Sequence, residues 1–138
     1  MQNGIILYTD GGARNNPGPA GAGAICYEGS KEIFAIKKYL GDRTNNWAEY
    51  EAVILALTEA KKRKFVKREI EVRSDSLLIV EQISGHWKIK EPALKLQHAN
   101  VRAILKDFSN IRFTHVPRGE NKEADRLVNE AIDETSRD

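Results

Sequence analysis

The sequence predicts an α/β fold in which a five-stranded mixed sheet, three antiparallel strands followed by two parallel ones, is flanked by helices. Three observations predict it. Short apolar runs rich in β-forming residues come first along the chain, and helical patterns then alternate with further short runs. The length of 138 residues is that of one ordinary domain. No internal repeat or long linker interrupts it, so we expect residues 1–138 to form a single domain.

Three strands are expected within the first 40 residues. Ile5–Thr9 is an apolar run that Asp10-Gly11-Gly12 is expected to end. Gly23–Tyr27 and Ile33–Leu40 follow, separated by the turn sequence Glu28-Gly29-Ser30. Short connections join antiparallel strands, so these runs predict a sheet built from hairpins.

The pattern changes to a helical period between Trp47 and Lys64. Alanines recur every four residues from Ala48 to Ala60, with Leu55 beside them, and strong helix formers fill the other positions. A long helix with a small-residue face suited to close packing is expected here.

A strand and two helices are expected next. Glu69–Arg73 alternates polar and apolar residues and predicts a fourth strand, with Asp75 just after it. Ser76–Ile83 predicts a short helix ended by Gly85, and Pro92 is typical of the first turn of another helix. The apolar positions of that helix are Leu94, Val101, Ile104, Leu105 and Phe108.

The last strand is expected at Ile111–Val116 and the last helix from Asn121 to about Thr135. Helical crossovers join parallel strands and are right-handed. If the fourth strand pairs with the first, Asp10 and Asp75 lie at neighbouring positions of adjacent parallel strands.

Composition excludes several classes of protein. Hydrophobic residues make up 41% and charged residues 30% of the chain, which indicates a globular rather than a disordered protein. No apolar stretch approaches the roughly 20 residues of a membrane span, and the start resembles no signal peptide. The single cysteine, Cys26, excludes an intramolecular disulfide and a Cys-rich zinc site. We expect a cytoplasmic monomer without a membrane partner.

The charge is unevenly distributed although the net charge is only +2. Basic residues concentrate between Lys61 and Arg73 and between Lys88 and Lys106. Such clusters attract a phosphate backbone, or they are solvated faces and ends of helices. Charge alone leaves both interpretations open.

Four acids stand where the local pattern does not need them: Asp10, Glu49, Asp75 and Asp125. Each alone has a structural explanation, as a turn residue, a helix N-terminal acid, an N-cap or a solvated helix residue. If they converge, they need a compensating charge, and oxygen ligands favour Mg²⁺ or Mn²⁺ over Zn²⁺. Two such ions would activate water and stabilise the leaving oxygen of a phosphodiester.

Four linked motifs, in order and over essentially the whole chain, resemble type 1 ribonuclease H. The resemblance is to a short form of the family, which we expect to be without the basic protrusion and without the hybrid-binding domain of many eukaryotic members. The motifs are Tyr8-Thr9-Asp10-Gly11-Gly12 with Asn16–Ala24, then Thr44–Glu49, then Ser74-Asp75-Ser76, and finally His115–Asn121 with Ala124-Asp125. The resemblance implies a ribonuclease H-like fold.

The resemblance also implies a reaction. Asp10, Glu49, Asp75 and Asp125 would hold two Mg²⁺ ions, which Mn²⁺ can replace. The RNA strand of an RNA/DNA hybrid would be hydrolysed endonucleolytically, leaving a 3′-hydroxyl and a 5′-phosphate. Double-stranded RNA is a further candidate substrate. The alternatives are a module that binds hybrids without cutting them and a DNA nuclease of the resolvase or integrase kind.

His115 is implied as a catalytic residue that helps proton transfer or product release, because it stands ten residues before Asp125. It could instead be a histidine that merely ends a strand. The following sequence Val116-Pro117-Arg118-Gly119 differs from the family's usual loop. Arg118 is therefore a candidate for contacting a phosphate.

Substrate choice depends on the 2′-hydroxyl, which backbone and amide groups can read without base sequence. The resemblance assigns this contact to Gly12, Asn16, Thr44, Asn45 and Asn46. The two asparagines at the start of the helix could equally cap it.

A short connection replaces the lysine-rich protrusion of the family. Only six residues lie between Gly85 and Pro92. Trp87 and Lys88 within it could contact the DNA strand by stacking and charge, or Trp87 could pack in the core. We expect modest, strongly salt-dependent affinity for hybrids.

Overall fold

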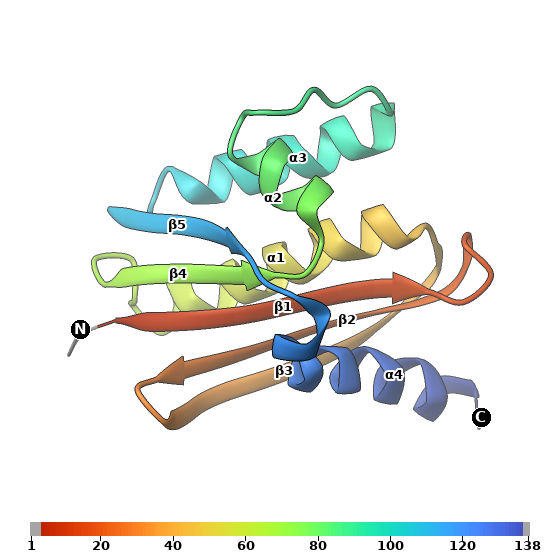
Figure 1. Cartoon of the computed structure of the whole chain (residues 1–138), viewed down its shortest axis with the longest axis horizontal. Helices are drawn as coiled ribbons and strands as arrows, with labels where there is room; N and C mark the ends of the chain where they lie inside the picture. Colours follow the sequence, from red (N-terminus) through yellow and green to blue (C-terminus); the bar gives the residue numbers. More distant parts are fainter. Residues whose placement is uncertain (1–3, 137–138) are drawn as a thin grey trace.

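Five strands form one sheet in the order β3-β2-β1-β4-β5 in the computed structural model, which describes residues 4–136 (Figure 1). The antiparallel strands are β1 (Ile5–Ala13), β2 (Gly18–Glu28) and β3 (Lys31–Arg43). β4 (Glu69–Ser74) pairs parallel with β1, and β5 (Asn110–His115) pairs parallel with β4. The predicted α/β fold with three antiparallel strands and two parallel ones is confirmed.

Helices cover both faces of the sheet (Figure 1). α1 (Asn45–Lys62) packs on β1 and β2, and α3 (Pro92–Leu105) packs on α1. α2 (Leu77–Ile83) follows β4. The short helix η1 (Arg118–Glu120) leads into α4 (Lys122–Ser136), which packs on β2 and β3 from the other side. None of the helices within residues 4–136 is long and apolar enough to cross a membrane.

β1 is longer than predicted, because the glycines expected to end it belong to the strand. The strand continues through Asp10, Gly11 and Gly12 and pairs with the start of β2. A Cβ atom at Gly11 would lie 2.2 Å from the carbonyl oxygen of Ala48 in α1. Glycine therefore serves the close approach of a helix here, and the predicted end at Thr9 is wrong.

β2 also starts earlier than predicted, at Gly18 instead of Gly23. A Cβ atom added at Gly21 would lie 2.9 Å from the Val128 carbonyl oxygen, and one added at Gly23 would lie 2.7 Å from the Ala124 carbonyl oxygen. The absence of side chains at these two positions lets α4 lie directly on the strand.

The end of α3 also differs from the prediction. The helix ends at Leu105, so Phe108, expected as one of its apolar positions, lies in the turn that follows. Phe108 is nevertheless part of the hydrophobic core, which fills the space between the sheet and α1 to α3. The spacing of the apolar residues predicted the burial of Phe108 correctly, but the predicted end of the helix was wrong.

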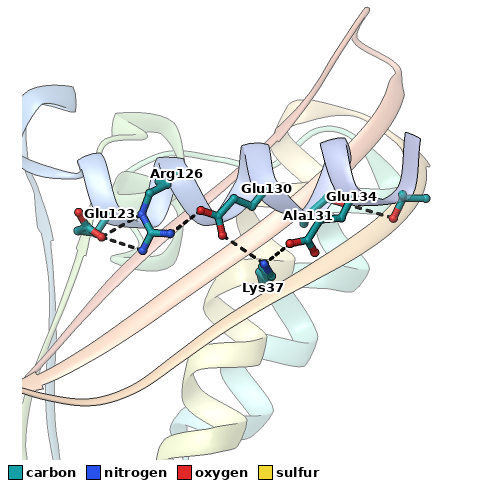
Figure 2. A network of polar contacts seen from close by, with 7 residues as sticks. Lys37, Glu123, Arg126, Glu130, Ala131 and Glu134 are labelled. Carbon is teal, nitrogen blue, oxygen red and sulfur yellow. Dashed lines mark hydrogen bonds and ion pairs between the residues drawn. The ribbon is translucent and has the colours of Figure 1, made fainter. Parts of the chain in front are cut away.

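A row of ion pairs joins β3 to the outer side of α4 (Figure 2). The Lys37 Nζ lies between the carboxylates of Glu130 and Glu134, and it is 3.2 Å from the Glu130 Oε1. Glu130 also pairs with Arg126, whose guanidinium reaches Glu123. All of these side chains are substantially solvent-exposed, so the contribution to stability is small and depends on salt.

Replacing the lysine tests this network. Lys37→Met is expected to lower Tm by only about 2 °C at low ionic strength, with a smaller effect in 1 M NaCl. Thermal unfolding at both salt concentrations measures it. Lys38→Met is the matched control, because Lys38 is also exposed on β3 but has no ion pair among the described residues. Equal shifts for both variants, or a shift that salt leaves unchanged, would contradict the interpretation.

Candidate active site

A cavity of about 320 Å³ gathers the four acids that the sequence singled out. Asp10, Glu49 and Asp75 each offer a carboxylate oxygen within 4.8 Å of the others. Asp125 lines the same cavity from α4. Four segments far apart in the sequence therefore place carboxylates in one hollow at the carboxyl ends of β1 and β4.

The parallel pairing of β1 and β4 places the first two acids. Thr9 of β1 is the register partner of Ser74 of β4. Asp10 and Asp75 are the next residues along the two parallel segments, so they lie side by side. Asp10 lies within β1 and is 7% exposed, whereas Asp75 stands between β4 and α2. This is the juxtaposition expected if the fourth strand pairs with the first.

Glu49 is held by the backbone of β1. The Gly11 backbone N–H donates to its Oε1 at 2.8 Å. Thr44 caps α1 by accepting from the Trp47 backbone N–H at 3.2 Å, which fixes where the helix begins. Glu49 then lies in the second turn of α1, facing Asp10.

Asn121 is a site residue that the sequence analysis did not single out. Its Nδ2 donates to the Thr9 carbonyl oxygen at 2.9 Å and to the Asp75 Oδ2 at 3.4 Å. The side chain is 1% exposed, and its Oδ1 has no partner among the described atoms. Its only signal in the sequence was its place at the end of the last motif. Asn121 ties the start of α4 to β1 and to Asp75, which directly follows β4.

The carboxylates strongly perturb one another. Burial, followed by repulsion from Asp75 and Asp125 and a hydrogen bond shared with Asp125, raises the pKa of Asp10 to about 8. Burial, followed by repulsion from Asp10 and Asp75, raises the pKa of Glu49 well above its ordinary value. The hydrogen bond from the Gly11 backbone and the charge of Arg118 lower this pKa only in part. These groups need additional positive charge to remain ionised together. Their oxygen-only donor set fits Mg²⁺ or Mn²⁺.

The raised pKa of Asp10 predicts a pH-dependent stability in the absence of metal. Asp10 titrates near 3.8 when unfolded and near 8 when folded, so the folded protein holds a proton that the unfolded chain has released. The contribution of Asp10 to the free energy of unfolding should therefore be highest below about pH 4 and fall as pH rises towards 8.

Urea denaturation in EDTA at pH 5, 6, 7 and 8 measures this dependence. Asp10→Asn should flatten the decline, whereas Asp42→Asn, at an exposed position outside the cavity, should keep it. A decline of the same slope in both variants would show that Asp10 does not cause it.

The residues predicted to bind substrate lie at the end of β1, in the β1–β2 turn and at the start of α1, and two of them reach the cavity. Gly12 and Asn45 line the cavity. The Asn45 Oδ1 accepts from the Ala13 backbone N–H at 2.6 Å, and its own backbone N–H donates to the Asn16 Oδ1 at 2.9 Å. The helix is capped by Thr44 and not by either asparagine at its start. Asn45 and Asn16 instead join the β1–β2 turn to α1.

Other predicted residues lie outside the cavity lining. His115 ends β5, and Trp87 and Lys88 lie in the connection between α2 and α3. Trp87 is 45% exposed, so it is not a core residue. Arg118, the candidate phosphate contact, does line the cavity. Arg14, which the sequence analysis passed over, lines it too and pairs with Asp133 at 2.6 Å.

The chain is similar to a known family over most of its length. It matches the family model described as reverse transcriptase-like over residues 8–131. It is 41% identical to ribonuclease HI of Halobacterium salinarum, an alignment that covers 94% of this chain and 65% of that protein. It is also 41% identical to the bifunctional protein Rv2228c of Mycobacterium tuberculosis, covering 94% of this chain and 35% of that protein. The chain thus spans from about a third to two thirds of the length of these relatives.

A solved structure shows the same fold. LC11-RNase H1, crystallised in complex with an RNA/DNA hybrid, is 48% identical to this chain and superimposes with a TM-score of 0.91. The superposition covers 95% of this chain and 98% of the other.

Proposed function

Because the chain belongs to the ribonuclease HI family, we propose that it is a metal-dependent endoribonuclease that hydrolyses the RNA strand of RNA/DNA hybrids. The approach of three carboxylates to within 4.8 Å of one another is the observation that carries this proposal. The hybrid bound by the similar LC11-RNase H1 supports the substrate class. A cytoplasmic monomer remains part of the prediction.

The four acids are proposed to hold two divalent ions, Mg²⁺ or in its place Mn²⁺. When bound, such ions supply activation of the attacking water and stabilisation of the leaving oxygen. Hydrolysis of the bond between the phosphorus and the 3′ oxygen leaves a 3′-hydroxyl and a 5′-phosphate. Hydrogen bonds within the chain orient two of the acids. The Gly11 backbone N–H donates to the Glu49 carboxylate, and the Asn121 side chain donates to Asp75.

Side chains around the acids are proposed to hold the hybrid. Those next to the cavity, on the β1–β2 turn and the start of α1, would contact the RNA strand at its 2′-hydroxyl groups. Trp87 and Lys88 would contact the DNA strand, Arg118 would contact a phosphate, and His115 would assist proton transfer or product release. The proposed RNA contacts are Gly12, Asn16, Thr44, Asn45 and Asn46.

A substrate panel tests the reaction. One end-labelled RNA strand is presented alone, paired with DNA and paired with RNA, and a labelled DNA duplex of the same sequence is added as a fourth substrate. We expect cutting of the hybrid, with products that carry 3′-hydroxyl and 5′-phosphate ends. The double-stranded RNA lane sets the breadth of the activity. Binding of the hybrid without cutting would indicate a binding module, and cutting of the DNA duplex alone would indicate a DNA nuclease.

A further inference from the structure

The connection between α2 and α3 has little regular structure of its own. It is the long loop at the top of Figure 1 and carries the exposed Trp87 and Lys88. Its first residues are tied to α2, because the backbone N–H groups of His86 and Trp87 donate to the Glu81 carbonyl oxygen. Trp87 is thus tied to α2 through its backbone, and Lys88, one residue further along, needs an anchor of its own.

A buried glutamine supplies that anchor. The Gln82 Nε2 of α2 donates to the Lys88 carbonyl oxygen at 3.3 Å. Within residues 4–136 this is the one hydrogen bond from a side chain to the Lys88–Lys90 backbone. Gln82 is only 5% exposed, so little water can reach its side-chain amide and take the place of this contact.

Tyr50 fixes the other end of the same amide. Its hydroxyl donates to the Gln82 Oε1 at 2.7 Å. The ring is fully buried and meets the ring of His98 in α3 edge to face, with centroids 6.4 Å apart. Tyr50 directly follows Glu49 in α1, so two linked hydrogen bonds run from the helix that carries this carboxylate to the loop that carries Trp87.

We propose that Tyr50 and Gln82 are positioning residues that hold the Trp87–Lys88 segment in register with the acidic cavity, so that it meets the DNA strand of the hybrid. This rests on the proposed function. Neither side chain reaches substrate, because both are buried. An apolar residue in place of Gln82 leaves the Tyr50 hydroxyl and the Lys88 carbonyl without partners, and the segment then samples other positions.

Gln82→Met keeps the length of the side chain and removes both hydrogen bonds. We expect KM for the hybrid to rise about three- to tenfold, the factor that one lost hydrogen bond gives, with kcat little changed. Tyr50→Phe should act in the same direction and more weakly. Exchange of backbone amide hydrogens should become faster in residues 86–91 and stay unchanged in the segments that carry the four acids. In a Trp87→Ala background, where only Lys88 is left to position, Gln82→Met should raise KM by a smaller factor than in the wild-type chain.

Gln97→Met is the matched control. Gln97 is another buried glutamine, 4% exposed, but it donates to the Trp47 carbonyl oxygen and to Glu51, not to the loop. It should lower Tm in the same way and leave KM unchanged. Equal KM changes in the two glutamine variants, or additive effects of Gln82→Met and Trp87→Ala, would overturn the proposal.

If the wild-type chain leaves the hybrid uncut, the proposed function fails, and this result does not by itself decide the positioning proposal. The positioning proposal is then decided by the Kd for a fluorescent hybrid in EDTA. A weaker Kd for Gln82→Met than for Gln97→Met supports it, and equal values contradict it.

Discussion

Asp10→Asn should reduce hybrid cleavage by about 10³-fold or more and at the same time stabilise the metal-free protein. The rate falls because a carboxylate at the centre of the proposed metal site is lost, and several kcal/mol of transition-state stabilisation go with it. Stability rises at pH 8 because Asp10 is buried beside Asp75 and Asp125, and these neighbours disfavour its charge. An amide of the same shape removes that repulsion.

Opposite changes in the two properties separate a catalytic from a structural acid. Single-turnover cleavage with Mg²⁺ and thermal unfolding in EDTA at pH 8 measure them. Asp107→Asn is the control, because Asp107 pairs with Lys61 on the surface outside the cavity and should leave the rate unchanged. An Asp10→Asn protein that is both inactive and less stable would mean that the carboxylate mainly supports the fold.

Gly11→Ala should destabilise the protein by about 2–4 kcal/mol and slow cleavage together. The added Cβ would lie 2.2 Å from the Ala48 carbonyl oxygen and 2.5 Å from the Glu49 backbone nitrogen. Backbone atoms cannot turn aside as a flexible side chain can, so α1 must move away from β1. That movement carries Glu49 away from Asp10.

Gly12→Ala is the matched control for stability, since its Cβ would meet only the Asn45 Oδ1, at an ordinary 3.7 Å. Urea denaturation of both variants with the same Mg²⁺ concentration measures the difference. If the two variants lose equal stability, the close packing of α1 on β1 is not what requires glycine at position 11.

The order of strands and helices could be predicted because it depends on local periodicity. The gathering of Asp10 and Asp75 was also within reach, because the carboxyl ends of adjacent parallel strands meet at one edge of the sheet. The course of the chain through Gly11 and Gly21 was not. Locally these glycines resemble turn residues, and the reason for them is a helix packed on the strand from 37 or more residues away.

The buried polar contacts were beyond sequence reasoning for the same reason. Asn121 reaches Thr9 across 112 positions, and Tyr50 reaches Gln82 across 32. An asparagine before a helix predicts a cap, and a tyrosine on a helix predicts core packing. Only the packing of α4 and α2 against the rest of the fold shows that these groups hold the site and its loop.

The most direct test of the account is the metal dependence of hybrid cleavage. The chain is stripped with EDTA, and the rate on a labelled hybrid is followed while Mg²⁺ or Mn²⁺ is added back. We predict no cutting without metal and full recovery with it, in the wild-type chain but not in Asp10→Asn. Cutting at the same rate in excess EDTA would contradict the claim that these carboxylates act by holding divalent ions.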